Sequence, residues 1–164
     1  MKKIVIVAAV VIVIAAGVWF YYKNKVAVPP VGTTNTMIRT VPVSNQGPFA
    51  YFQLNMEGAD GISGEILLNG TSVKKMTGTG FQGAFNQAQD LIVDGENKIE
   101  LRIDSVAPGA VPRNIAFQEN ALITIALSAL NAQDFPTEKD QAFLINWNAA
   151  DGNNVVYTFS IGRK

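Results

Sequence analysis

The residues that could bind a nucleotide lie in the glycine-rich run GTGFQG at residues 78–83, which has the literal G-x-G-x-x-G spacing and is followed by an acid, Asp104. A dinucleotide site needs a buried strand directly before the first glycine and a full helix after the last one. The preceding KKMT is not an apolar strand, and Asp94-Gly95 interrupts any helix that starts near residue 84. We therefore interpret the run as a flexible glycine-rich loop and expect no cofactor.

Acidic residues in two turns could bind Ca²⁺. Asp60 and Glu65 flank glycines in EGADGISGE, and Asp94 and Glu96 lie in a second turn. Neither spacing matches an EF-hand loop, the ligands are too few, and ordinary Asp-Gly turn chemistry accounts for both groups. We expect no metal. Two carboxylates could also hydrolyse a glycosidic bond, so a carboxylate-dependent glycosidase is kept as the least favoured alternative.

The chain contains no histidine and no cysteine. The missing cysteine excludes disulfides, zinc thiolate sites and thiol nucleophiles, and the missing histidine removes the usual base at neutral pH and the commonest metal ligand. Most familiar catalytic constellations are thus excluded. The sequence predicts a protein that is not an enzyme.

Uncharged polar and aromatic side chains are the candidate ligand contacts. Amides on the outward faces of two predicted strands, beside aromatics, suit sugar hydroxyls because an amide both donates and accepts hydrogen bonds. The alternative is a neutral, solvated face. Two phenylalanines of the glycine-rich loop would mark a contact site if exposed, and would otherwise close one end of the domain. The six candidates are Gln53, Asn55, Asn146, Asn148, Phe81 and Phe85.

The elements that must position these residues follow from a two-residue hydrophobic period. Strict alternation predicts five half-buried strands, at residues 49–57, 98–104, 122–130, 143–148 and 155–161. Asn69-Gly70 predicts a tight hairpin with a type I′ turn. Residues 37–43 predict an edge strand, in which Pro42 removes one backbone donor that no neighbouring strand needs. Asp151-Gly152 predicts a hairpin between the last two strands. Helical turns are expected only at residues 85–91 and 131–140.

Together these elements predict an all-β fold. Seven or eight short antiparallel strands without a long amphipathic helix are typical of an antiparallel β-sandwich, with either a jelly-roll or an immunoglobulin-like strand order.

Residues 65–104 carry a resemblance to a known family. A strand runs into an Asn-Gly turn (ILLNGTSV), a glycine-rich loop with aromatics follows (GTGFQGAF), and a Gly-Glu-Asn turn then opens a strand (LIVDGENKIELRID). This order resembles the galactose-binding-like jelly rolls attached to many glycosidases. The resemblance implies a non-catalytic jelly roll that often binds sugars at its loop end. It assigns no individual ligand-contacting residue.

An almost unbroken apolar run, IVIVAAVVIVIAAGVWFYY, occupies residues 4–22. As a helix, these 19 residues would span about 28 Å, close to the roughly 30 Å hydrocarbon core of a bilayer. Lysines precede the run, and aromatic rings that prefer the headgroup level end it. The sequence thus predicts an N-terminal transmembrane signal-anchor over residues 1–25, and its membrane-anchoring residues are Lys2, Lys3, Trp19, Phe20, Tyr21 and Tyr22.

The alternative is a signal peptide cleaved after Ala15-Ala16-Gly17. Four bulky aromatics follow that cluster instead of a polar mature start, so we interpret the segment as uncleaved. Lys2, Lys3 and the α-amino group precede the span, and Lys23 and Lys25 follow it. The positive-inside rule then places the N-terminus in the cytoplasm. We expect a single-pass protein of a bacterial inner membrane with a periplasmic or extracellular C-terminal domain.

Beyond the anchor, residues 26–36 form a short linker containing Pro29-Pro30 and residues 37–164 form one β-sandwich domain. Without Lys2, Lys3, Lys23 and Lys25 the chain has 9 basic and 13 acidic residues, a net charge of −4. That balance argues against nucleic acid as a partner. The leading hypothesis is a membrane-anchored, non-catalytic module that binds a protein partner or a glycan in the bacterial cell envelope. The alternative is a structural subunit of a larger envelope membrane complex.

Overall fold

The computed structural model describes residues 36–85, 87–111 and 121–164 of the chain. The predicted anchor at residues 1–25 and all of the linker except residue 36 lie outside the described residues. Among the described residues, no helix has the length and apolar character needed to cross a membrane.

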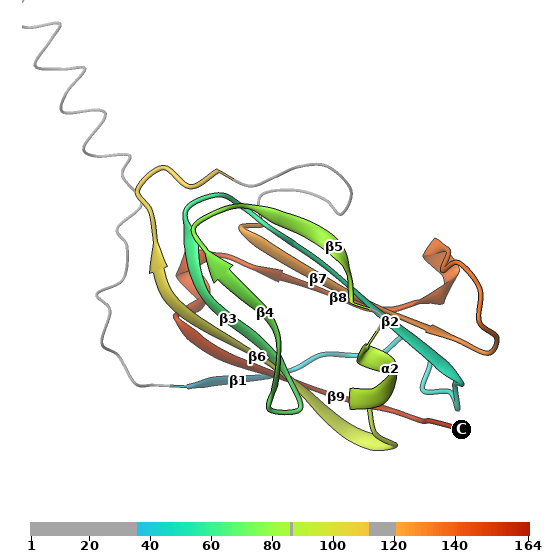
Figure 1. The fold of residues 1–164 in the computed structure, drawn as a ribbon. Coiled ribbons are helices and arrows are strands. Elements are labelled where there is room, and N and C mark those ends of the chain that lie inside the picture. Colours follow the sequence, from blue (N-terminus) through green and yellow to red (C-terminus); the bar gives the residue numbers. More distant parts are fainter. Residues whose placement is uncertain (1–35, 86, 112–120) are drawn as a thin grey trace, which may run out of the picture.

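Two sheets form the fold, one above the other in Figure 1. The five-stranded sheet has the order β1-β9-β6-β3-β4, and the four-stranded sheet has the order β5-β2-β7-β8. The strands are β1 (Met37–Thr40), β2 (Tyr51–Gly58), β3 (Ile62–Leu68), β4 (Thr71–Thr77), β5 (Phe81–Phe85), β6 (Gly95–Val106), β7 (Ile123–Leu130), β8 (Gln141–Trp147) and β9 (Asn154–Ile161). The helical elements are α2 (Ala88–Leu91), η1 (Glu138–Asp140) and η2 (Ala149–Asp151). The all-β, two-sheet prediction is confirmed.

The hydrophobic core lies between the sheets and follows the predicted alternation. Leu54, Ile99 and Ile125 are fully buried, and Trp147 donates its indole N–H to the backbone oxygen of Gly152 at 3.0 Å. Branched and aromatic side chains at every second position give each sheet one apolar face, and the two faces bury each other. The inward-facing residues of all five predicted strands are buried.

Most connections cross from one sheet to the other; only β3–β4 and β7–β8 join neighbours in the same sheet. The β3–β4 turn has the predicted Asn69-Gly70, both with positive φ (50° and 84°), as a type I′ turn requires. The predicted hairpin at Asp151-Gly152 is wrong. There the chain leaves β8 in one sheet and enters β9 in the other, through the 3₁₀ turn η2.

Two further differences concern edge strands. β1 is an edge strand as expected, but it pairs with β9 in parallel, Met37 opposite Val155. Residues 81–85, expected to be a flexible loop, form the edge strand β5, which pairs with residues 54–58 of β2. The sequence pattern does not predict this strand, because Gly83 stands at the position between Phe81 and Phe85 where alternation would need an apolar side chain. The described residues therefore contain nine strands instead of seven or eight.

Candidate functional site

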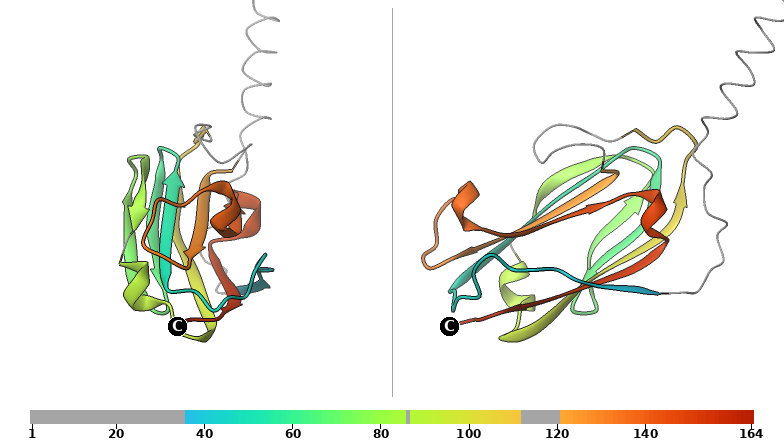
Figure 2. Two further views of the ribbon diagram at one scale, coloured as in Figure 1. Left: turned by 90° about the vertical axis from the view of Figure 1, so that its right-hand side faces the viewer. Right: turned by 180° about the vertical axis from the view of Figure 1, so that it is seen from behind.

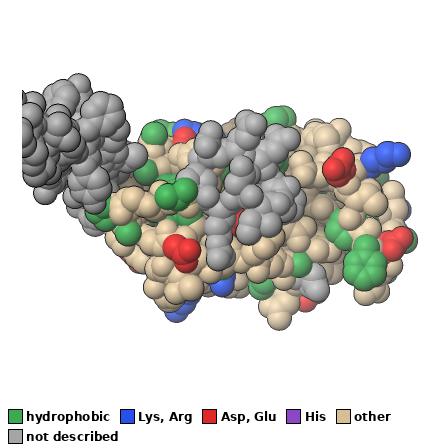
Figure 3. Space-filling model, turned by 90° about the horizontal axis from the view of Figure 1, so that it is seen from above, with side chains coloured by type: hydrophobic (Ala, Val, Ile, Leu, Met, Phe, Trp, Pro, Cys, Tyr) green, Lys and Arg blue, Asp and Glu red, His purple; other side chains and the backbone are tan. Residues whose placement is uncertain are grey.

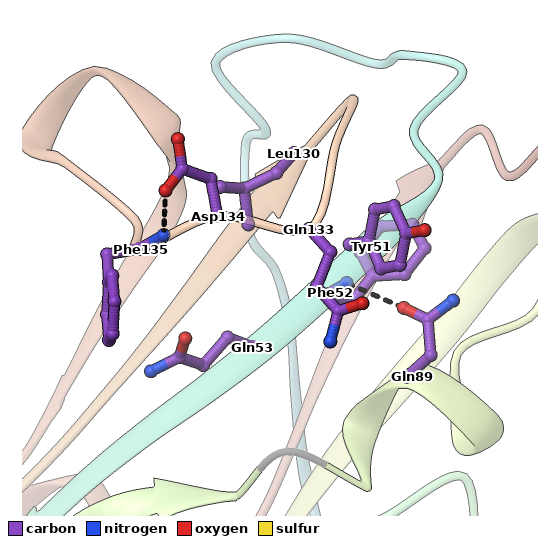
Figure 4. A pocket seen from close by; sticks show the side chains of 8 residues that line it. All are labelled: Tyr51, Phe52, Gln53, Gln89, Leu130, Gln133, Asp134 and Phe135. Atoms are coloured by element: carbon purple, nitrogen blue, oxygen red, sulfur yellow. Dashed lines mark hydrogen bonds between the residues drawn. The ribbon is translucent and has the colours of Figure 1, made fainter.

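A cleft of about 620 Å³ opens at one end of the four-stranded sheet, on the face turned away from the core. Its lining comes from β2, from α2, from the end of β7 and from the segment that follows β7, with Phe135 on one side and Tyr51 on the other (Figure 4). The lining residues are Tyr51, Phe52, Gln53, Gln89, Leu130, Gln133, Asp134 and Phe135. The volume lies within the usual range of small-molecule sites.

Strand alternation places the floor of the cleft. Phe52 and Leu54 point into the core, so Tyr51 and Gln53 point to the outer face. Leu130 lies directly opposite Tyr51 in the β2–β7 ladder and shares its face. The Tyr51 side chain is 37% exposed, so its ring forms a surface that a ligand can contact.

The helix α2 forms one wall because the side chain of Gln89 bonds to the backbone of β2. The N–H of Phe52 donates to Gln89 Oε1 at 2.8 Å, and Gln89 Nε2 donates to the oxygen of Ala50 at 2.7 Å. β5 pairs with β2 only from Leu54 onward. The Gln89 amide therefore bonds to the part of the β2 edge that β5 does not reach. Its oxygen and one of its N–H groups are thus already hydrogen-bonded within the protein.

The opposite wall is the segment between β7 and η1. Asp134 Oδ1 accepts the N–H of Phe135 at 2.7 Å, and a capping box formed by Thr137 and Asp140 starts η1. The Phe135 ring is 91% exposed, the highest value among the exposed large apolar side chains. A ring left in water gains little for folding, so the Phe135 ring is available for contact with a ligand.

The cleft is nearly uncharged. Among the described lining residues, Asp134 is the single carboxylate and none is lysine or arginine. The exposed Gln133 amide and the Tyr51 hydroxyl have no hydrogen-bond partner among the described residues. Seen from above, the described surface is mostly uncharged, with charged side chains scattered over it (Figure 3). The cleft can therefore offer aromatic faces, neutral donors and acceptors, and one carboxylate.

Groups with a shifted pKa lie outside the cleft lining. Hydrogen bonds from the side chains of Lys98 and Arg102 lower the pKa of Glu100. Burial, followed by the charge of Asp151, raises the pKa of Tyr157 to about 12. The Tyr157 phenol therefore stays protonated at neutral pH and does not supply a base.

The amides selected from the sequence do not form one site. β7 separates Gln53 and Asn55 on β2 from Asn146 on β8. Gln53 donates to Asn55 at 3.1 Å, and Asn146 accepts from the Thr124 hydroxyl at 3.2 Å. Asn148 belongs to the capping box of η2. Of these four, only Gln53 lines the cleft.

The two selected aromatics lie on β5 and pack against the core, each half-buried. The Phe81 ring covers Gly58 so closely that a Cβ there would lie 2.1 Å from Phe81 Cε1. The ammonium of Lys74 lies 4.8 Å from the centre of the same ring. Phe81 thus has a packing role at the edge of the sandwich.

Sequence reasoning missed Tyr51, Gln89, Gln133 and Phe135 as site residues. They come from three separate segments that only the fold brings together. One signal was present: an isolated aromatic, Phe135, in a segment of polar residues with no apolar period.

The acids considered as Ca²⁺ ligands have roles in turns. Asp60 Oδ1 accepts the N–H of Gly80, and Asp94 Oδ1 accepts the N–H of Arg163. Glu65 lies opposite Lys75 in the β3–β4 ladder. No group of three or more acids that could hold a metal ion occurs in residues 36–85, 87–111 and 121–164.

The turns that carry the galactose-binding-like resemblance bond to each other. Asn69 Nδ2 donates to Asn97 Oδ1 at 2.7 Å, and Asn69 Oδ1 accepts the N–H of Lys98 at 2.8 Å. Asn97, only 2% exposed, also accepts the N–H of Val93 and donates to the oxygens of Val93 and Gly95. This Asn69–Asn97 cluster holds the β3–β4 turn against the start of β6.

Comparisons of this chain with protein-family models, with curated proteins and with solved structures found no match.

Proposed function

We propose that this protein is a non-catalytic binding module of the bacterial cell envelope and that it binds a neutral glycan in the cleft at the end of the four-stranded sheet. The observation that carries the proposal is the exposed Phe135 ring across the cleft from Tyr51, with amides and one carboxylate among the described lining residues.

The chemistry of the lining favours a sugar. Aromatic rings present flat apolar faces to the C–H side of a pyranose, and amides both donate to and accept from hydroxyl groups. The described lining residues include no cation to pair with an acidic sugar, and Asp134 repels such a sugar. A neutral glycan therefore fits better than an anionic one.

The proposal includes the location and the finer fold. The apolar run at residues 4–22 and its aromatic end support a single-pass signal-anchor in the inner membrane, with the domain outside. The many connections between sheets support a jelly roll in preference to an immunoglobulin-like order. The bonds of the Asn69–Asn97 cluster support the galactose-binding-like resemblance, because they join the two turns on which it rests.

The cleft is tested by measuring binding of the full-length protein, in mild detergent, to an array of neutral and acidic bacterial oligosaccharides. We expect neutral oligosaccharides to bind, and Phe135→Ala to weaken binding about tenfold through loss of one stacking face. Val93→Ala, at an apolar position 51% exposed and outside the cleft lining, is the matched control. Unchanged binding in Phe135→Ala, or a preference for acidic oligosaccharides, would contradict the proposal.

The anchor is tested separately by N-terminal sequencing and carbonate extraction of the native protein. We expect an intact N-terminus and retention in the membrane pellet. A mature protein that begins at or after Gly17 would show that the segment is a cleaved signal peptide.

A further inference from the structure

The sheet edges differ in how they are protected against pairing with another strand. An exposed edge offers unpaired N–H and C=O groups, and natural proteins blunt it with charges, short strands or covering segments. β4 carries Lys75, and it carries Lys74 on its inward face, opposite Ile66. β1 has only four residues and includes Arg39, which pairs with Asp151 at 2.9 Å.

Among the described residues, the four-stranded sheet has one edge that is covered in part and another that no strand pairs with. At β8, Ser44 donates its backbone N–H to the oxygen of Ala142 and its hydroxyl to the oxygen of Gln141. The part of the β2 edge that β5 does not reach is covered by Gln89, which bonds to the backbone of Phe52 and Ala50. β5, by contrast, has the sequence FQGAF, without charge, proline or bulge, and its only strand partner in the described part of the chain is β2.

The inward face of β5 contains a notch. Phe81, Gly83 and Phe85 lie opposite the inward-facing Gly58, Met56 and Leu54. Both phenylalanines pack against the core, whereas a Cβ built on Gly83 would meet no atom of the described residues within 4 Å. The position between the two half-buried rings is therefore open to an added side chain, and this open position is the notch.

We propose that the free edge of β5 binds an extended segment of a partner protein, which adds a strand to the four-stranded sheet. Added strands bind through backbone hydrogen bonds, and their specificity comes from alternate side chains. The segment carries an apolar side chain that fills the notch at Gly83. The Lys74 ammonium beside Phe81 favours an acidic residue at that end of the segment.

A second copy of this chain fits the edge poorly. In an antiparallel pair of β5 strands centred on Gly83, each Gly83 would face the other and both notches would stay empty. The geometry therefore favours a different chain with a larger side chain at the central position. This site is separate from the glycan cleft, whose lining contains no residue of β5.

The test is selection of random nine-residue segments, displayed on phage, on the full-length protein in mild detergent. We expect the selected segments to have apolar residues at every second position and an acid near one end. A synthetic peptide of the selected sequence should slow hydrogen–deuterium exchange of residues 81–85. Failure to select any segment, segments without alternation, or protection elsewhere in the chain would overturn the proposal.

Matched variants locate the site. Gly83→Lys places a charge in the notch and should weaken peptide binding about tenfold or more, because the peptide would desolvate an unpaired ammonium. Gly83→Val fills the notch without a charge, and should weaken binding while keeping the circular dichroism spectrum unchanged. Ser72→Lys adds the same charge to the exposed face of β4 and should not alter binding. If Gly83→Lys instead turns a dimer into a monomer, the occupant is a second copy and the proposal fails.

Discussion

Two regions rich in amide side chains use them in opposite ways. In the Asn69–Asn97 cluster, both hydrogens and the oxygen of the Asn97 amide bond within the protein, and the residue is 2% exposed. In the cleft, Gln133 is exposed beside the rings of Tyr51 and Phe135. The same chemical group is structural where all its bonds are made inside and available to a ligand where they are not.

The comparison predicts its largest effect at Asn97. Asn97→Ala removes four hydrogen bonds and leaves backbone groups of Val93 unpaired beneath the β3–β4 turn. We expect a loss of about 3 kcal/mol in the free energy of unfolding. Urea titration of the purified protein followed by circular dichroism measures it. Asn55→Ala is the control: Asn55 accepts a single side-chain hydrogen bond, from Gln53, and should cost less than about 1 kcal/mol. Equal losses of unfolding free energy in both variants would contradict the distinction between structural and available amides.

Asn69 tests whether the cluster acts as a unit. Asn69→Gly keeps a residue that tolerates positive φ in the turn but loses the bonds to Asn97, Leu91 and Lys98. We expect a loss of about 1 to 2 kcal/mol in the free energy of unfolding. In a double-mutant cycle with Asn97→Ala, the coupling should be about 1 kcal/mol. Additive losses would show that the two amides stabilise their turns independently.

An ion pair outside both regions predicts a smaller, pH-dependent effect. Because Lys98 and Arg102 lower the pKa of Glu100, the folded state binds its proton less tightly than the unfolded state. The stabilisation is present above the ordinary pKa of 4.5 and is lost as the pH falls through the lowered value. Glu100→Gln should cost less than about 1 kcal/mol at pH 7. Urea titrations at pH 7 and pH 3 should show the difference from wild type shrinking at the lower pH.

The smallest stability change is expected in the cleft. Phe135→Ala removes a ring that is 91% exposed, so the free energy of unfolding should change by less than about 0.5 kcal/mol. Thermal melts of wild type and variant measure this change. Together with the loss of oligosaccharide binding, an unchanged melting temperature would separate ligand contact from folding. A large drop in that temperature would instead assign Phe135 a structural role.

The sequence predicts the core strands well because their side chains obey a strict two-residue period. Ile99, Leu101 and Ile103 alternate with Lys98, Glu100 and Arg102, and the structure buries the first set together with Glu100, which is 8% exposed. The period says nothing about which strands pair. Asp151-Gly152 predicts a hairpin equally well whether the chain turns back within a sheet or crosses to the other one, and here it crosses.

The candidate site was less predictable because its residues are far apart in the sequence. Gln53 could be selected from its strand, but its neighbours Gln89 and Phe135 lie in segments without a period. Conversely, Asn148 has the residue type of a ligand contact and serves as a cap, with its N–H donating to Asp151 at 2.7 Å. Residue type identified amides as candidate ligand contacts. Hydrogen bonding within the fold decided which of these amides remain free to bind a ligand.

The parallel pairing of β1 with β9 places Met37 and the cleft at opposite ends of the domain. Met37 enters the sandwich beside Val155, whereas Phe49 forms a bridge with Arg163 at the other end of β9, next to the start of β2 (Figure 1). Seen from behind, in the right-hand view of Figure 2, the C-terminus lies at one end of the domain and β1 lies toward the other. At about 3.3 Å per residue, β9 separates these ends by roughly 25 Å. The chain therefore enters the sandwich at one end and the cleft opens at the other, so the entry strand β1 contributes no residue to the cleft lining.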